Sequence, residues 1–250
     1  MSLASTTLGD GPRRAVIVHG IMGSGRNWRS IARRLAAALP EWHFVSVDLR
    51  NHGDSQGFAG PHDLAACAED LAELEPELIL GHSFGGKVAL AALRDLGVPE
   101  VWVLDAVPGP MAASPWLDDL LGALRRVPVP LQRRELLREH LELSESMESW
   151  MMTNLRSTPE GLVWRIDLDR IEEMLESYGE TDFWPLIEST RSPVTFVRAS
   201  RSERWTPELI SRFEELPPWS PVRLLTLDAG HWMHVDNPQG LLALLIEGLS

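Results

Sequence analysis

The sequence has little cysteine, little lysine and no long apolar run. Cys67 is the single cysteine of 250 residues, so no disulfide can form within the chain, and a reducing compartment fits. Lys87 is the only lysine, which we interpret as a bias of genome composition towards arginine. No apolar run reaches the length of a membrane span, and no signal-peptide pattern opens the chain. We therefore expect a cytoplasmic protein, or one of an organelle stroma if a transit peptide has been removed.

The charge balance disfavours a nucleic-acid partner. The net charge is −13, whereas a nucleic-acid-binding protein usually presents a basic face. A hydrophobic content of 44% and a charged content of 24% are ordinary for a globular protein, and the length is sufficient for a large core. The composition leaves the oligomeric state open.

Strand-like and helix-like segments alternate in the first 110 residues. Apolar strands are expected at 15–18, 44–47, 77–80 and 101–104, with helices between them. Such alternation predicts an α/β fold with a mostly parallel, doubly wound sheet. Further strands are expected at 194–197 and 222–227, before a last helix at 238–248.

Residues 111–187 interrupt this alternation. Their leucine and methionine residues recur at helical spacing, and we find no convincing strand among them. We predict an α/β core of residues 1–110 and 188–250 with an inserted helical lid at 111–187. The Met, Leu and Trp side chains of this lid predict an apolar acyl pocket, although many of them are also needed to pack the lid onto the sheet.

The hexapeptide at 81–86, GHSFGG, lies between an expected strand and an expected helix. G-x-S-x-G in that context is typical of a nucleophile elbow, a sharp turn that exposes a serine at the end of a sheet. The glycines keep Cβ atoms out of a space where chain segments pass closely. Ser83 is therefore the candidate nucleophile.

A serine hydroxyl needs a general base beside it, and the base needs an acid that orients it. His231, in the loop after the last expected strand, is the candidate base. Glu203 follows the strand at 194–198, the usual place for the acid, and is the first choice. Asp105 follows the strand at 101–104 and is the second choice. A solvated loop charge for Glu203 and a turn cap for Asp105 are the structural alternatives.

Acyl transfer also needs backbone N–H groups that stabilise an oxyanion. The amide of Phe84, which opens the helix after the nucleophile, is one candidate. The second is expected from the glycine-rich loop at 19–23, where Ile21 is preferred to Met22. Four further residues are predicted to border the substrate: His19, His82, Asn51 and Trp232. His19 is also expected to brace its own loop.

Residues 81–87 also match the first part of a phosphate-binding loop, G-x-x-x-x-G-K. That loop requires Ser or Thr at the next position to hold Mg²⁺, but Val88 stands there. We therefore predict no nucleotide, no other cofactor and no metal site.

Four motifs in this order resemble the α/β-hydrolase fold superfamily: HG-x-x-G at 19–23, D-x-R-x-H-G-x-S at 48–55, the elbow, and A-G-H-W at 229–232. The residues within these motifs are similar to those of a small esterase subgroup that cleaves short acyl esters and thioesters. In such relatives the acid can follow either strand, and glutamate at 203 departs from the commoner aspartate.

The motifs and the resemblance together predict a cofactor-free serine hydrolase. It would cleave a small carboxylic ester or thioester with an apolar acyl part through an acyl-enzyme at Ser83. Two alternatives stay open: other cofactor-free chemistry on the same fold, such as C–C hydrolysis, lyase or haloperoxidase reactions, and a receptor that binds a small ligand without turnover.

Overall fold

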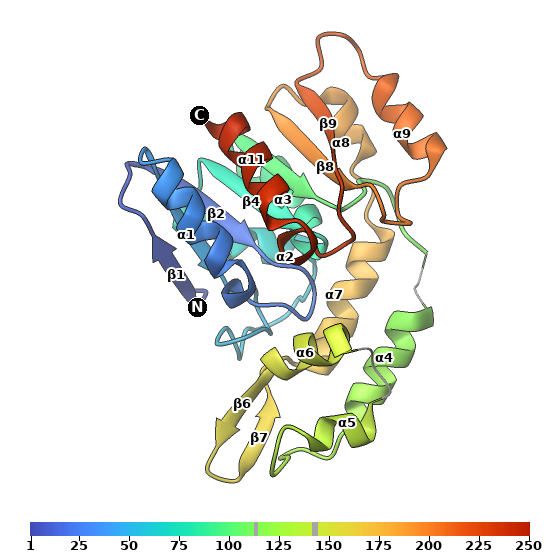
Figure 1. The fold of residues 1–250 in the computed structure, drawn as a ribbon. Coiled ribbons are helices and arrows are strands. Elements are labelled where there is room, and N and C mark those ends of the chain that lie inside the picture. The colour runs from blue at the N-terminus through green and yellow to red at the C-terminus, as the bar shows by residue number, and fades with distance from the viewer. Residues whose placement is uncertain (113–114, 142–144) are drawn as a thin grey trace.

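A seven-stranded sheet forms the centre of the computed structural model, which describes residues 1–112, 115–141 and 145–250 (Figure 1). The strands lie in the order β1-β3-β2-β4-β5-β8-β9, and only β1 runs antiparallel to its neighbour. The predicted mostly parallel, doubly wound sheet is thereby confirmed. The strands are β1 (Ser5–Leu8), β2 (Arg13–Val18), β3 (Trp42–Val47), β4 (Leu78–His82), β5 (Glu100–Leu104), β8 (Val194–Ala199) and β9 (Val222–Leu227).

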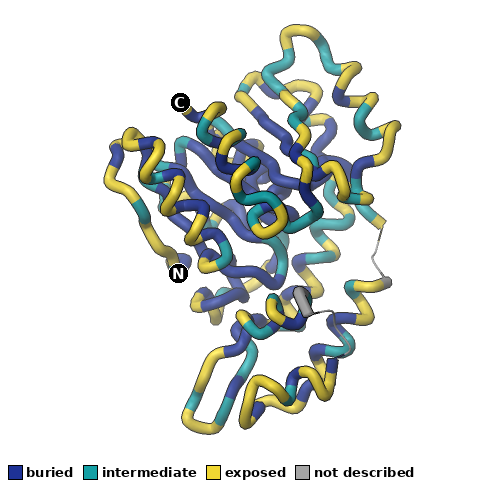
Figure 2. The backbone as a smooth tube through the Cα atoms, in the orientation of Figure 1, coloured by how far each residue is buried: buried dark blue, intermediate teal, exposed yellow. Residues whose placement is uncertain are grey.

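Both faces of the sheet are buried, because successive strand side chains point to opposite sides. Val16 and Val18 of β2 pack with α2 (Leu64–Glu69) and α3 (Phe84–Leu96) on one face. Ala15 and Ile17 pack with α1 (Arg29–Ala38) and α11 (Pro238–Leu249) on the other. The buried strands therefore lie between two helical layers (Figure 2). The short elements η1 (Gly25–Trp28), η2 (Ala72–Leu74), α9 (Pro207–Glu214) and α10 (Met233–Asp236) complete this part of the molecule.

The segment between β5 and β8 lies beside the sheet in Figure 1 and is mainly helical. Its helices are α4 (Pro115–Arg126), α5 (Leu136–His140), α6 (Glu145–Thr153), α7 (Leu168–Glu180) and α8 (Trp184–Ser189). Residues 113–114 and 142–144 of the predicted lid lie outside the described residues. The division of the chain at 110/111 and 187/188 stays a prediction.

The expectation that 111–187 contains no strand is wrong. A short antiparallel hairpin joins β6 (Leu155–Thr158) to β7 (Gly161–Trp164). Gly161, at φ +137°, adopts a conformation that other residues rarely reach, and its absent Cβ leaves room for the carbonyl of Leu131. The Pro159-Glu160-Gly161 turn before the apolar run Leu162–Trp164 was the available signal for this hairpin.

The parallel strands bring several loops to one edge of the sheet. The loops that follow β2, β4, β5, β8 and β9 all leave from strand carboxyl ends, where open α/β sheets bind ligands. These loops carry most of the site residues predicted from the sequence. No helix among the described residues is both long and apolar enough to cross a bilayer.

Candidate active site

The turn between β4 and α3 is tight and strained. Ser83 has φ +53° and ψ −118°, in a region that side chains other than glycine rarely occupy. A Cβ at Gly81 would lie 2.0 Å from the carbonyl oxygen of Gly85, and a Cβ at Gly85 would lie 2.5 Å from that of Val18. Glycine at these two positions is therefore a steric requirement of the turn that presents Ser83.

Ser83, His231 and Asp105 form one hydrogen-bonded series. The hydroxyl of Ser83 lies 3.0 Å from Nε2 of His231, and Nδ1 of His231 donates to Oδ2 of Asp105 at 2.7 Å. The three residues come from loops after β4, β9 and β5, which are far apart in the sequence. A nucleophile, a base and an acid that orients the base are the parts that acyl transfer requires.

Asp105 is fully buried, yet its carboxylate is well supplied with donors. The amide of Ala199 and Nε1 of Trp205 both donate to Oδ1, at 3.0 Å and 2.7 Å. Burial alone would raise the pKa of Asp105, but the hydrogen bonds from His231, Ala199 and Trp205 hold it below its usual value. Asp105 is therefore ionised and oriented at neutral pH.

The surroundings of His231 favour the neutral form of its imidazole. Burial lowers its pKa, the charge of Arg204 lowers it further, and the carboxylate of Asp105 opposes both. A neutral ring with Nδ1–H directed at Asp105 presents the lone pair of Nε2 to Ser83. This is the protonation state that a general base needs.

Of the two carboxylates that the sequence left open, the structure brings Asp105 to His231 and leaves Glu203 exposed. The first choice for the acid thus differs from the observed geometry. The reason is positional: β5 lies directly beside β4, and Asp105 adopts φ +48° where the chain leaves that strand. The last residue of β8, Ala199, and Trp205 of the loop that follows contribute donors to Asp105.

The two amides predicted in the glycine-rich loop have different surroundings. The Met22 amide donates to Nε2 of His52 at 3.0 Å and is not available to a substrate oxygen. Within the described residues the Ile21 amide has no such acceptor. A Cβ at Gly20 would lie 3.2 Å from that of Ser83, so glycine lets this loop lie against the elbow. The amide of Phe84 belongs to the first turn of α3, where N–H groups lack intrahelical acceptors.

Two buried histidines support the loops on one side of Ser83. His19 donates from Nδ1 to the carbonyl of Gly20 and accepts the Leu49 amide at Nε2. His52 donates from Nδ1 to Arg50 and accepts the Met22 amide. Burial lowers the pKa of His19 to about 4 and that of His52 to about 3, so both rings are neutral and each can donate and accept.

His82 supports the other side of the site. Its Nε2 donates to the backbone carbonyl of His231 at 2.7 Å, and burial lowers its pKa well below the usual value. The residue before Ser83 therefore holds the loop that carries His231.

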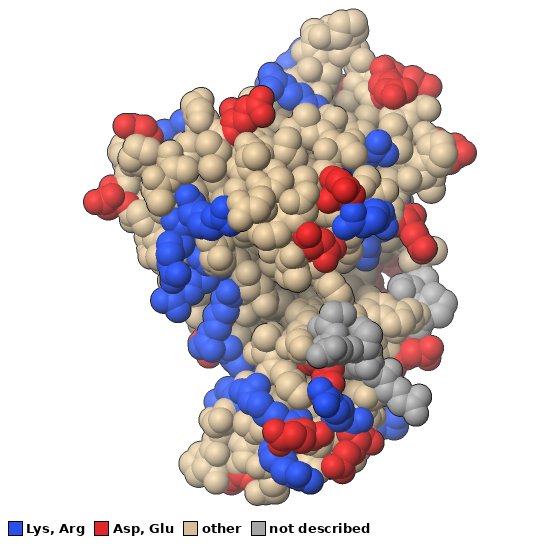
Figure 3. Space-filling view, viewed as in Figure 1, with Lys and Arg blue, Asp and Glu red and all other residues tan. Residues whose placement is uncertain are grey.

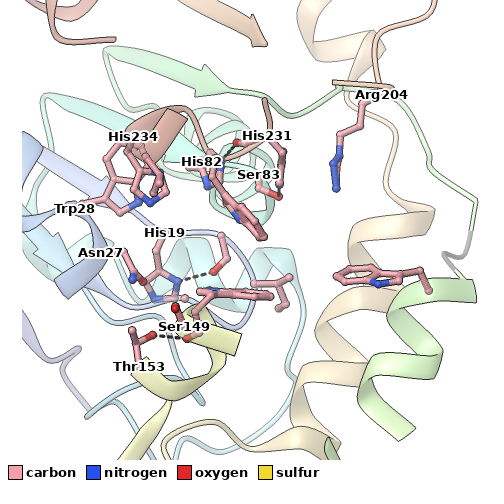
Figure 4. A pocket seen from close by; sticks show the side chains of 17 residues that line it. His19, Asn27, Trp28, His82, Ser83, Ser149, Thr153, Arg204, His231 and His234 are labelled. Atoms are coloured by element: carbon pink, nitrogen blue, oxygen red, sulfur yellow. Dashed lines mark hydrogen bonds between the residues drawn. The ribbon is translucent and has the colours of Figure 1, made fainter. Parts of the chain in front are cut away.

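A cavity of about 370 Å³ opens beside Ser83 (Figure 4). Of the four residues predicted to border the substrate, His19, His82 and Trp232 line this cavity, whereas Asn51 does not. Asn51 is buried at φ +65°, and its amide contacts His62 and Met174 instead. Its role in the structure is to shape the loop after β3.

The inserted segment supplies part of the cavity wall. Trp116 of α4 and Trp150 of α6 line the cavity, and the ring of Trp150 lies 5.7 Å from that of Trp232. Sequence reasoning did not single out these residues, nor Trp205 and Arg204 of the loop after β8. For Arg204 and Trp205, the only signal in the sequence was the position of their loop directly after a parallel strand.

Comparison with known proteins assigns the chain to a family. A family model described as Alpha/beta hydrolase family matches residues 15–244. The chain belongs to this family. The resemblance inferred from the four motifs is thereby confirmed.

Curated relatives of the family cover most of the chain. The sn-1-specific diacylglycerol lipase ABHD11 of Mus musculus is 29% identical over 244 residues, which are 90% of this chain and 76% of that protein. Esterase YbfF of Escherichia coli strain K12 is 26% identical over 248 residues, covering 91% of this chain and 89% of that one. The expected enzyme class, a carboxylic ester hydrolase of this family, is the class to which both names belong.

A solved structure shares the fold of this chain. A solved structure described as a marine microorganism esterase superposes with a TM-score of 0.84 at 24% identity, covering 98% of each chain. Within the part of the chain that the structure describes, no cluster of three or more His, Cys, Asp or Glu side chains is arranged to hold a metal ion.

Proposed function

We propose that this α/β-hydrolase cleaves a carboxylic ester or thioester through an acyl-enzyme at Ser83. The observation that carries the proposal is the hydrogen-bonded series from Asp105 through His231 to Ser83 at the wall of a mainly apolar cavity. The lipase and esterase names of the relatives support the same class of reaction.

In the first half-reaction, Nε2 of His231 takes the hydroxyl proton while Oγ of Ser83 attacks the acyl carbon. Asp105 holds the ring in place and stabilises the imidazolium that forms. His231 then gives the proton to the leaving alcohol or thiol. In the second half-reaction His231 takes a proton from water, the hydroxide attacks the acyl-enzyme, and the proton returns to Ser83 as the carboxylic acid leaves.

The developing oxyanion needs donors that are already in position. The amides of Phe84 and Ile21 are the proposed pair, because the first lies in the opening turn of a helix and the second on the glycine loop beside Ser83. Met22 is not included, since its amide is bound to His52.

The inserted segment at 111–187 is the proposed lid of the acyl pocket. Its Trp116 and Trp150 face the same cavity as Ser83, which supports an apolar site for the acyl part of the substrate. We propose no cofactor, because the series of side chains described above supplies the nucleophile and both proton-transfer roles.

A panel of p-nitrophenyl esters of increasing acyl length tests this function. We expect turnover that Ser83→Ala and His231→Ala each reduce by at least about 10³-fold with unchanged circular dichroism. Ser211→Ala, an exposed serine of α9, is the matched control and should retain wild-type rates. Ligand binding without any turnover by the wild-type protein would instead favour the receptor alternative.

A further inference from the structure

Arg204 is a cation in the wall of the cavity. It follows β8 in the chain, and its side chain extends from that loop into the opening between Ser83 and the inserted segment (Figure 4). Its Nε atom is buried and has no hydrogen-bond acceptor within the described residues. Because a buried guanidinium N–H without an acceptor is costly, this arrangement calls for an explanation.

Other arginines of the same region have carboxylate partners. Arg201, three residues earlier, is exposed and pairs with Asp228, and Arg212 of α9 pairs with Glu188 at 2.6 Å. Figure 3 shows a further group of basic side chains along the edge that carries α1, away from this loop. Among the described residues no carboxylate forms an ion pair with Arg204.

The charge of Arg204 acts on the reacting groups. It is close enough to His231 to lower the pKa of the imidazole, in addition to the effect of burial. His231 must become a cation during acyl transfer, so an uncompensated positive charge beside it opposes the reaction. An anion bound to Arg204 would cancel this effect at the moment when substrate occupies the cavity.

We propose that Arg204 binds a negatively charged group of the substrate, a carboxylate or a phosphate, beyond the scissile carbonyl. This inference rests on the proposed function and narrows its substrate class. A guanidinium presents a planar set of donors that suits either oxyanion. Trp116, Trp150 and Trp232 would pack against the apolar part of the molecule that joins the anionic group to the ester.

Matched pairs of esters test the proposal and distinguish the two sources of charge. In the first arm, p-nitrophenyl hemiglutarate is compared with p-nitrophenyl hexanoate, so the carboxylate is on the acyl part. In the second arm, the hexanoyl ester of glycerol phosphate is compared with butyl hexanoate, so the phosphate is on the alcohol part. Arg204→Gln should lower the anionic-to-neutral ratio of kcat/KM by about 10- to 100-fold in one arm, the range expected for a hydrogen-bonded ion pair.

Two further variants show whether the charge itself is responsible. Arg204→Lys keeps the charge without the planar fork and should retain part of the ratio. Arg201→Gln removes the same charge from the same loop outside the cavity and should leave the ratio within about twofold of wild type, because exposed pairs contribute little. If Arg204→Gln and Arg201→Gln lowered the anionic-to-neutral ratio of kcat/KM equally, the proposal would be overturned. The preference would then come from long-range attraction of anionic substrates to the positively charged loop.

Binding without turnover separates this inference from the proposed function. In Ser83→Ala protein, calorimetric titration should show tighter binding of one anionic ester than of its neutral counterpart, and Arg204→Gln in that background should remove the difference. Equal affinity for charged and neutral esters in both arms would refute the role of Arg204 while leaving ester hydrolysis intact. A charge preference in a wild-type protein that hydrolyses no ester would support the anion site and refute the proposed function.

Discussion

Asp105 illustrates how a single residue depends on its neighbours. Its carboxylate receives hydrogen bonds from a side chain after β9, a side chain after β8 and a backbone amide of β8. These three donors fix the direction of both oxygens, and the oxygen that faces His231 in turn fixes which nitrogen of the imidazole carries the proton.

Replacement of each candidate acid by its amide should therefore affect kcat unequally. Asp105→Asn should lower kcat by roughly 10²–10⁴-fold, because an amide can stabilise the wrong tautomer of His231 and cannot balance an imidazolium. Glu203→Gln removes an exposed charge from the loop after β8, and its kcat should stay within about twofold of wild type. Steady-state kinetics on one ester measures both, and a larger loss for Glu203→Gln would reverse the assignment.

The pH dependence of activity follows from the groups around His231. Burial and Arg204 lower its pKa, while Asp105 and Asp236 raise it. The acidic limb of kcat/KM reports the base in the free enzyme, so its midpoint should lie below the ordinary value of about 6.5. Arg204→Gln removes a positive charge and should move that midpoint to higher pH on a neutral ester. A midpoint that moves down would contradict the proposed electrostatic contact.

At the scale of elements, Lys87 joins α3 to the inserted segment. Its Nζ is fully buried and donates to the carbonyls of Gly109, Tyr178 and Thr181 at 2.7–2.9 Å. Burial lowers its pKa to about 8, with Asp182 opposing the shift. The only lysine of the chain thus holds the helix that follows Ser83 against the end of α7.

Reductive methylation should reveal this contact directly. In the native protein only the α-amino group should react, since Lys87 is inaccessible, and Lys87 should react only after unfolding. Mass spectrometry of the intact chain and of its peptides measures the difference. Rapid methylation of Lys87 under native conditions would mean that α7 separates from α3 in solution.

Removal of the amine should also cost stability. Lys87→Met leaves the carbonyls of Gly109, Tyr178 and Thr181 without their donor, and we expect a loss of about 2–4 kcal/mol in the free energy of unfolding. Arg94→Gln changes an exposed cation on the same helix and should cost less than about 0.5 kcal/mol. Urea denaturation measures both, and equal losses would remove the special role of the buried contact.

At the scale of the whole molecule, one continuous apolar cluster unites the sheet and the inserted segment. Val16 and Val103 of the sheet belong to the same cluster as Leu124 of α4, Met151 of α6 and Met174 of α7. Parts that share a core of this kind cannot separate without exposing apolar surface on both sides. We therefore expect the two parts to unfold together.

Urea unfolding followed by tryptophan fluorescence and by far-UV circular dichroism should give coincident transitions. Leu124→Ala, at a fully buried position of α4, should lower the stability by about 2–5 kcal/mol and shift both transitions equally. Two separate transitions, with only the first affected by Leu124→Ala, would show that the inserted segment unfolds by itself.

The sequence alone predicted the features that depend on neighbouring residues. The glycines around Ser83 reveal the elbow because steric exclusion in a tight turn acts over a few positions. The period of the apolar residues predicted the strands and α3 because burial on two faces requires it. The hairpin β6–β7 was missed, since its strands are only four residues long and lie among helices.

The choice between Asp105 and Glu203, the loss of the Met22 amide to His52, and the place of Arg204 in the cavity were decided by the tertiary structure alone. Each depends on contacts between loops that are tens of residues apart in the chain. Local conformational preferences can place a carboxylate or an amide at the end of a strand. Only the packing of several strands and helices determines which partner it meets there, because that meeting depends on orientations that no single segment controls.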